Sequence, residues 1–279
     1  MRHIAHEVSR QHGDATALCR GLGFSPADLE RVDFRVSYAQ TGRVIVRAQQ
    51  LLGDPHLGLR LGASFSLVSW GLCLVGMMAS PTAREALDFA LDFLPSTERF
   101  LRLQRDDGEG HLAATAEPMH DDEPEVSRFL VEHAFAALTR ACRFVIAPWY
   151  GPKRVEFSAD APADPRGHEE AFGCPVLFGC RADRLVFDPI DQPVATADAL
   201  VARLCRHQLE QRAGAARRQG AGAVSCSVIE QDGPSAVRVW VCGDPSHSGQ
   251  ATRARLQDKR QAALARLAIW SSTSRTNFL

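Results

Sequence analysis

The residue types that a nucleophilic enzyme uses gather in one stretch of the chain, at His168, Cys174 and Asp188. A thiolate attacks an electrophile once a neighbouring base has taken its proton, and histidine is a common base. Cys174, however, lies in a Gly-Cys-Pro break before a short strand, where a small buried residue serves packing. We favour the packing role and expect that the chain is not an enzyme.

The same stretch contains the residue types of a metal site, because Cys174, Cys180 and His168 all carry atoms that bind zinc. Their spacing matches no zinc pattern, and their neighbours in the strands are apolar. The eight cysteines of the chain include no Cys-x-x-Cys pair, so neither a zinc ribbon nor a redox motif is indicated. We expect no metal and no cofactor, and we interpret the cysteines as small buried hydrophobic residues.

The pattern of residues 168–189 predicts the elements that position these side chains. A short helix is followed by the Gly-Cys-Pro break, a first strand, a turn at Gly179 and a second strand that ends at Asp188-Pro189. A period of two in the apolar residues indicates that one face of each strand is buried. These apolar residues are Val176 and Phe178 in the first strand, and Leu185 and Phe187 in the second.

Helices with well-marked ends are predicted in the first half of the chain. Ser37 and Gln40 form a capping box at the start of a helix that stops at Gly53. Asp54-Pro55 and Ser80-Pro81 each place a capping residue before a proline at the first helical position, and Pro95 halts the second of these helices. The core-facing positions are Tyr38, Val44, Ala48 and Leu51 or Leu52, then Leu57 and Leu61, then Ala83, Leu87, Leu91 and Leu94.

The remaining body mixes strands with helices. Residues 100–118 predict a hairpin, 125–145 a long helix, and Val155 with Phe157 a short strand. A last helix over 197–212 has Leu200, Leu204 and His207 along its expected core side. The fold class is therefore α+β, helix-rich with short antiparallel strands and without the β-α-β rhythm of a parallel sheet.

Composition excludes several classes of protein. Of 279 residues, 45% are hydrophobic and 23% are charged, as in a globular protein. The longest apolar run, 72–79, is too short to span a bilayer, and the charged N-terminus lacks the apolar core of a signal peptide. We therefore expect a cytoplasmic protein with no membrane partner.

Charge is divided unevenly along the chain. Residues 211–279 contain 10 Lys and Arg against 4 Asp and Glu, a balance of +6. The whole chain contains 32 against 33, so residues 1–210 contain 22 against 29, a balance of −7. Two readings of the basic end stay open: contact with a polyanion, or a solvated arginine-rich segment.

The regular pattern ends after Arg212. Residues 214–222 have no apolar period and indicate a linker. Val237, Val239 and Val241 alternate as in a strand, but the glycines, proline and serines of 243–249 interrupt the pattern at once. Residues 251–270 allow a basic helix with only a thin apolar stripe. The C-terminal segment is therefore expected to be incomplete or poorly ordered.

Several runs of the chain resemble the N-terminal effector domain of one branch of the AraC/XylS family of bacterial transcription regulators. They are LLGDPHLGLRLG (51–62), Trp70-Gly71-Leu72 leading to ASPTAREALDFALDFLP (79–95), VEFSADAPAD (155–164) and AFGCPVLFGCRADRLVFDP (171–189). The resemblance implies that residues 1–212 sense a small-molecule effector or form a homodimer. It also implies that the protein acts at promoter DNA through a C-terminal pair of helix-turn-helix units.

The C-terminal part departs from that family pattern. Residues 230–235 resemble the opening of the first helix-turn-helix unit and 254–259 the end of its recognition helix, but the residues between do not fit, and the second unit is absent. We therefore interpret 213–279 as a linker and a helix-turn-helix remnant, produced by a frameshift or truncation. DNA binding is expected to be impaired, with Arg253, Arg255 and Lys259 as the residues for phosphate contact. The alternative is a stand-alone binding or dimerisation module that lacks DNA binding.

Three residues are candidates for an effector pocket: Trp70, Met77 and His133. His133 lies on the apolar side of the predicted helix 125–145, and pockets for small molecules are mainly apolar with few polar groups. Packing in the core is the alternative for all three. Arg84 and Arg99 could clamp an anionic effector or lie exposed on a helix.

Overall fold

The computed structural model of the chain describes residues 1–31, 34, 36–97, 100–108, 111–119, 123–188 and 192–222. The helices are α1 (Arg2–Arg10), α2 (Ala15–Cys19), α3 (Tyr38–Leu52), α4 (Leu57–Ala63), α5 (Leu72–Ala79), α6 (Ala83–Thr97), α7 (Pro124–Val145), α8 (Arg166–Phe172) and α9 (Ala199–Gly222). The strands are β1 (Leu101–Gly108), β2 (His111–Pro118), β3 (Arg154–Glu156), β4 (Val176–Leu177) and β5 (Asp183–Phe187). The helix-rich α+β prediction is confirmed.

The sheet has the strand order β1-β2-β5-β3-β4. Its neighbours are antiparallel except β3 and β4, which pair in parallel through Val155 opposite Val176. Because α8 connects β3 to β4, the described part of the chain contains one β-α-β connection, which the sequence pattern did not predict. Strands of two or three residues are too short for a sequence pattern to show their direction.

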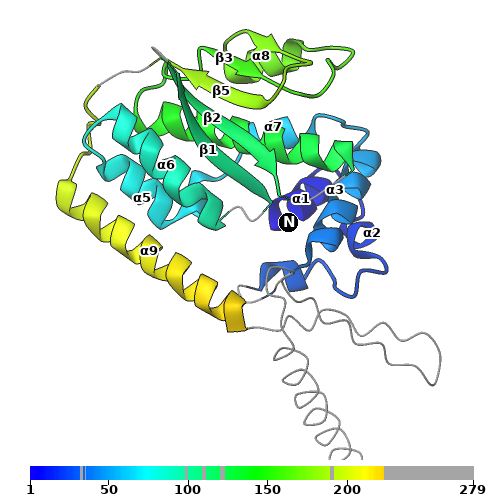
Figure 1. The fold of residues 1–279 in the computed structure, drawn as a ribbon. Helices are drawn as coiled ribbons and strands as arrows, with labels where there is room; N and C mark the ends of the chain where they lie inside the picture. The colour runs from blue at the N-terminus through cyan, green and yellow to red at the C-terminus, as the bar shows by residue number, and fades with distance from the viewer. Residues whose placement is uncertain are drawn as a thin grey trace, which may run out of the picture. The chain divides into compact units, whose positions relative to one another are not determined.

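Helix α7 lies against the sheet and links it to the N-terminal helices (Figure 1). Its apolar residues enter two hydrophobic clusters. The larger cluster joins α5, α6, α7 and the sheet, with Phe89, Phe135, Phe172 and Phe187 among its buried rings. The smaller cluster joins α1 to α4 with the first turns of α7, through residues such as Val8, Leu18, Ile45 and Phe129. Leu130 packs against both clusters.

Several predicted helix ends agree with the structure. Ser37 and Gln40 form the expected capping box at the start of α3. Gly53 ends the same helix in the left-handed conformation, with φ at 60°, which favours glycine. Tyr38 is half-buried, and Val44 and Ala48 are buried as expected; Ile45 joins them, whereas Leu51 is 47% exposed.

The two proline-based helix starts were wrong by two residues. Asp54 accepts a hydrogen bond from the backbone N–H of His56, which forms a turn, and α4 begins at Leu57. Ser80 donates to the carbonyl of Gly76, so Thr82 caps α6 instead, accepting from the N–H of Glu85. Pro95 does not stop α6, which continues to Thr97. The expected core positions are buried in both helices: Leu57, Leu61, Ala83, Leu87, Leu91 and Leu94.

Helix α9 differs from its prediction in length and in its buried face. It continues to Gly222, where a linker was expected after Arg212, because alanine, arginine and glutamine are strong helix formers. Leu200 and Leu204, expected to face the core, are 59% and 55% exposed, whereas Cys205 and Leu209 are buried. Both pairs are spaced four residues apart, so the apolar period alone did not decide between the two faces.

Residues Met1–Gly214 form one compact unit. The strand pattern at 237–241, the basic helix at 251–270, and Arg253, Arg255 and Lys259 all lie outside the described residues. Within the described residues, every helix falls short of the length or the apolarity that crossing a bilayer demands.

Candidate functional site

A buried carboxylate occupies the middle of α7. Glu132 is 1% exposed, among the apolar residues through which α7 packs on its neighbours. Arg128 lies one turn earlier, and its Nε donates to Oε1 of Glu132 over 2.8 Å. An ionised group in such a place needs partners, because burial removes the water that would otherwise solvate it.

His168 reaches the same carboxylate from α8. Its Nε2 lies 2.9 Å from Oε1 of Glu132, and the histidine is 1% exposed. The rings of Phe157 and Phe178 meet it edge to face, with ring centroids 5.6 and 5.2 Å away. This packing fixes the direction in which the imidazole points.

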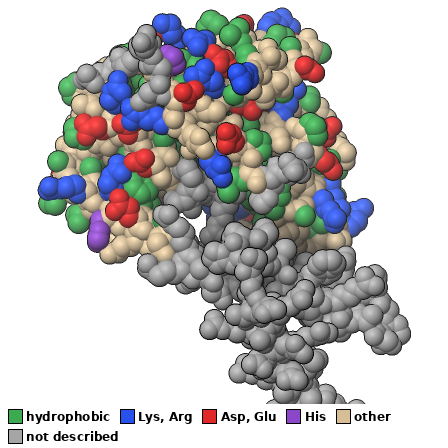
Figure 2. Space-filling view, viewed as in Figure 1, with side chains coloured by type: hydrophobic (Ala, Val, Ile, Leu, Met, Phe, Trp, Pro, Cys, Tyr) green, Lys and Arg blue, Asp and Glu red, His purple; other side chains and the backbone are tan. Residues whose placement is uncertain are grey.

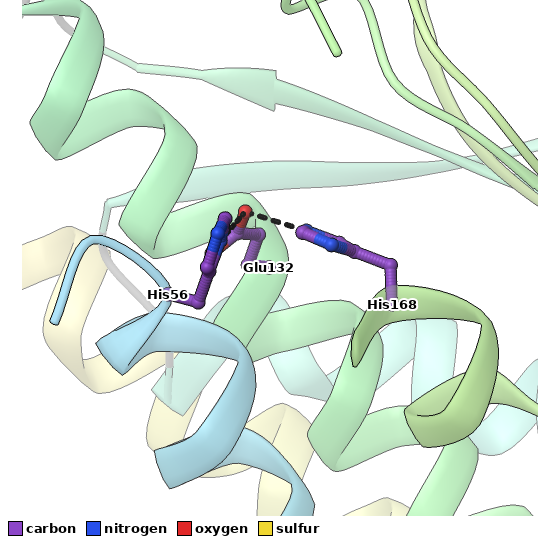
Figure 3. Close-up of side chains that lie close together, drawn as sticks. All are labelled: His56, Glu132 and His168. Carbon is purple, nitrogen blue, oxygen red and sulfur yellow. Dashed lines mark hydrogen bonds and ion pairs between the residues drawn. The ribbon is translucent and has the colours of Figure 1, made fainter. Parts of the chain in front are cut away.

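His56 completes the cluster from the residue before α4. Its Nδ1 lies 3.8 Å from Oε1 of Glu132, and its side chain is 30% exposed. The imidazole rings of His56 and His168 lie 4.9 Å apart, almost perpendicular. Figure 3 shows the two histidines on opposite sides of the carboxylate, so three separate helical segments converge on one oxygen atom.

Close packing of α4 on α7 brings His56 to this place. A Cβ atom on Gly58 would overlap the backbone carbonyl of Phe129, and one on Gly62 would overlap that of His133. Glycine at both positions therefore allows the helix backbones to approach each other. The motif DPHLGLRLG thus supplies both His56 and the glycines that position it.

The electrostatics of the cluster keep Glu132 ionised. Burial raises the pKa of this carboxyl group, but the hydrogen bonds from His168 and Arg128 and the nearby imidazole of His56 outweigh it and lower the pKa to about 2. Not every polar atom is satisfied, however. Oε2 of Glu132, Nδ1 of His56, Nδ1 of His168 and Nη2 of Arg128 are buried without a hydrogen-bond partner. Such atoms are uncommon in folded proteins, and four around one carboxylate indicate a site for a further group.

A second feature, an apolar cavity, lies on α7 at the next residue, His133. The cavity has a volume of about 140 Å³. Its walls come from α1, α3, α4 and α7 and are mainly apolar or aromatic, and they comprise Met1, His3, Ile4, Thr41, Ile45, Leu61, Phe65, Phe100, Phe129, Leu130 and His133. His133 meets Phe65 edge to face and lies parallel to Phe129, at 5.3 and 6.1 Å between ring centroids. Burial lowers the pKa of His133 to about 4, so its ring is neutral at pH 7.

The three residues predicted for an effector pocket are not brought together. His133 lines the cavity. The ring of Trp70 lies with its centroid 6.5 Å from that of Phe65, which also lines the cavity. Met77 is fully buried in the larger cluster and does not line the cavity. Arg84 is half-buried on α6, and Arg99 lies outside the described residues.

A larger, more open groove of about 540 Å³ lies between α6, β1 and α9. Two ion pairs lie along it: Arg105 with Asp88 at 2.7 Å and Arg206 with Asp92 at 2.8 Å. The guanidinium of Arg206 also covers the rings of Phe89 and Phe93, each at 5.1 Å. The contacts of Arg206 hold α9 against α6, so we assign the groove to the packing of α9.

The structure places Cys174, His168 and Asp188 with different partners. His168 is hydrogen-bonded to Glu132, and Asp188 pairs with Lys153 at 3.0 Å. Burial raises the pKa of Cys174 to about 11, which leaves the thiol protonated at neutral pH. In the part of the chain that the structure describes, the metal-binding grouping that includes His168 is formed with His56 and Glu132, and neither Cys174 nor Cys180 joins it.

Comparison with known proteins decides the family. Residues 13–192 match the family described as the arabinose-binding domain of AraC transcription regulators, N-terminal. The chain belongs to this family. The match covers every element from the capping box of α3 to the end of the sheet, and it includes His56, Glu132 and His168.

Two relatives from Pseudomonas aeruginosa extend the comparison. The ornithine utilization regulator of strain PAO1 is 28% identical over 208 residues, which are 73% of this chain and 59% of that protein. The chain therefore spans less than two thirds of that relative's length. The crystal structure of the transcriptional regulator CdpR matches with a TM-score of 0.57 at 15% identity, over 76% of this chain and 63% of that one. This second likeness shows a shared fold.

In the sequence, His168 is considered only beside Cys174, Cys180 and Asp188, a grouping for which we expect neither catalysis nor a metal. His56 stood in a quoted family run without a chemical role, and Glu132 was not singled out. The three residues are separated by 76 and 36 positions along the chain, so no local spacing links them. The one local signal was a Glu at an inward-facing position of an otherwise apolar helical stripe.

Proposed function

We propose that this protein is a transcription regulator of AraC type whose N-terminal unit senses a small effector with a single aromatic ring. The supporting observation is the cavity beside His133. An apolar cavity of about 150 Å³ holds a benzene ring, and the cavity here has a volume of about 140 Å³. Its aromatic walls suit an aromatic ring, and the imidazoles of His3 and His133 offer hydrogen bonds to a polar substituent.

The place of the cavity suits a sensor. It lies between the smaller cluster, built on α1 to α4, and helix α7, which also packs on the sheet. A ligand in this cavity would contact both the smaller cluster and α7 and stabilise their packing against each other. A ligand that binds only the folded state shifts the folding equilibrium toward that state.

Thermal unfolding with a panel of one-ring aromatic compounds tests this proposal on the full chain. A compound that binds should raise the Tm of the native protein and of Met77→Leu, because Met77 does not line the cavity. His133→Phe keeps an aromatic ring against Phe65 and Phe129 but loses the hydrogen bond, so the rise in Tm should shrink. An unchanged rise in His133→Phe, or its loss in Met77→Leu, contradicts the assignment.

We propose that DNA binding is impaired relative to an intact regulator. The support is the sequence between 236 and 253, which fits neither helix nor turn of a helix-turn-helix unit. On the face drawn in Figure 2, basic and acidic side chains are interspersed, which argues against a polyanion site on that face of the N-terminal unit. Residual contact would then come from Arg253, Arg255 and Lys259, and it would be non-specific and strongly salt-dependent.

Footprinting on the DNA upstream of the protein's own gene tests this at moderate salt. Impaired DNA binding is supported if the protein protects no part of this DNA and if Arg253→Ala weakens the remaining binding equally for all DNA sequences. Sequence-selective protection that persists as salt rises contradicts it. Protein that forms clean dimers but protects no DNA favours the alternative, a stand-alone binding or dimerisation module.

A homodimer is part of the proposal, supported by an apolar patch on α9. Leu200 and Leu204 lie one turn apart and are 59% and 55% exposed. Leu200→Lys with Leu204→Lys should convert the dimer to a monomer in sedimentation experiments. Val68→Lys, at an apolar residue 82% exposed on another segment, should leave the dimer intact. A dimer that survives the double substitution excludes this face.

A further inference from the structure

The cluster at Glu132 has the donor set of a metal site. One imidazole nitrogen from His56, one from His168 and one carboxylate oxygen from Glu132 lie within 4.8 Å of one another. Tetrahedral zinc binds these atom types at about 2.0–2.2 Å, which places neighbouring ligands roughly 3.3 Å apart. The contacts of 2.9 and 3.8 Å to Oε1 of Glu132 lie on either side of that spacing, so small side-chain movements would complete the geometry.

The surroundings have the features that metal sites share. Arg128 donates to the carboxylate of Glu132, as ligating carboxylates are usually held by a further hydrogen bond. The rings of Phe157 and Phe178 form an apolar wall behind His168. His56, with its side chain 30% exposed, provides access from solvent. Three protein ligands leave one tetrahedral position open for water or another small ligand.

A hydrogen-bonded network without a metal explains less of the cluster. It accounts for Oε1 of Glu132, which accepts from Arg128 and His168. It leaves Oε2 of Glu132 and Nδ1 of His56 without partners, although both atoms are buried. A cation bound to the carboxylate of Glu132 would also accept the lone pair of Nδ1 of His56.

We propose that His56, Glu132 and His168 bind one divalent first-row cation, with Zn²⁺ as the reference ion. The cation takes the place of the hydrogen on Nε2 of His168, so that this nitrogen offers its lone pair while the neutral imidazole carries its hydrogen on Nδ1. Two imidazoles and one carboxylate suit Zn²⁺, Fe²⁺, Co²⁺ and Ni²⁺ better than Mg²⁺ or Ca²⁺, which prefer oxygen ligands. The site would link α4, α7 and α8, three segments that are distant in sequence. It does not depend on the effector cavity or on DNA binding.

Metal binding to the full chain tests the proposal. Protein stripped with a chelator is titrated with Zn²⁺ by calorimetry and with Co²⁺ by visible absorption, which reports the coordination of the ion. We expect the native protein to bind one more equivalent of Zn²⁺ than His56→Gln or Glu132→Gln. Zn²⁺ should raise the Tm of the native protein. Co²⁺ should give the native protein a visible absorption spectrum that both variants lack. Arg128→Gln should bind about 10–100-fold more weakly, since it removes only the support of a ligand.

His6→Gln is the matched control. His6 lies 2.6 Å from Glu30, so it is also a histidine beside a carboxylate, but both side chains are exposed and none of the described residues joins them as a third ligand. It should bind as the native protein does. Because the side chain of His56 is 30% exposed, His56→Gln is expected to fold, and circular dichroism checks this. Equal stoichiometry and affinity in the native protein, His56→Gln and Glu132→Gln would overturn the proposal.

Discussion

At the scale of single residues, burial decides which titratable groups matter. Cys174 belongs to a nucleophilic residue type, yet burial keeps its thiol protonated at neutral pH. Glu132 is an ordinary carboxylate by type, but its position in the core makes it the centre of a polar cluster. The chemistry of this protein therefore follows from surroundings that bring distant residues together, and not from the residue types within one motif.

Glu7 provides a pH-dependent contribution to stability. Hydrogen bonds from Arg10, Gln11 and Arg60, the first being the largest effect, lower the pKa of Glu7 to about 2 against the partial opposition of burial. The contact with Arg60 ties α1 to α4. A folded-state pKa below the unfolded value stabilises the protein above about pH 4.5, and this contribution is lost as the pH falls toward 2.

Glu7→Gln should therefore lower the free energy of unfolding by about 1–2 kcal/mol at pH 7, a value reduced from the full linkage for partial solvent screening. The difference between native protein and variant should shrink steadily below pH 4.5. Urea unfolding at several pH values measures it. A difference that stays constant from pH 7 to pH 3 would show that the effect of Glu7 is not electrostatic.

At the scale of elements, the sequence predicted those whose signals are local. The capping box at Ser37, the stop at Gly53 and the hairpin of β1 and β2 all depend on residues a few positions apart. The buried face of α9 and the parallel pairing of β3 with β4 depend on contacts with distant segments. His56, Glu132 and His168 belong to this second class, which is why their meeting could not be predicted.

Gly58 is the element-scale requirement for the Glu132 cluster. Gly58→Ala would place a Cβ atom against the backbone carbonyl of Phe129, which cannot move aside as a flexible side chain can. We expect the substitution to push α4 away from α7 and to destabilise the protein by about 2–3 kcal/mol. It should also weaken Zn²⁺ binding, since His56 precedes α4.

Gly42→Ala is the control for helix propensity. Gly42 lies inside α3, and an added Cβ would meet only methyl groups of Val126 at ordinary contact distance, 3.7 Å at the nearest. Alanine should stabilise this helix by about 0.5–1 kcal/mol. Denaturant unfolding compares the two variants, and destabilisation of similar size in both would contradict the role given to close helix packing at Gly58.

At the scale of the whole N-terminal unit, α7 couples two hydrophobic clusters. Val126 and Phe129 belong to the smaller cluster, whereas Val131 and Phe135 belong to the larger one. One continuous helix therefore passes from one cluster to the other, with Leu130 in contact with both. If either cluster came away from α7, the apolar side chain of Leu130 would lose its contacts on that side. The two clusters therefore depend on each other, and we expect residues 1–214 to unfold cooperatively.

Ile45→Ala tests this coupling, with Trp70 as the probe. Ile45 is 1% exposed in the smaller cluster, and its truncation should cost about 2–4 kcal/mol. Trp70 lies in the larger cluster and becomes the sole tryptophan when Trp149, Trp240 and Trp270 are replaced by phenylalanine. If the unit is cooperative, Ile45→Ala lowers the urea midpoint of Trp70 fluorescence and of circular dichroism by the same amount. If the smaller cluster unfolds independently, the fluorescence midpoint stays in place while the circular dichroism transition splits. That result would mean that α7 does not transmit the state of the cavity beside His133 to the sheet.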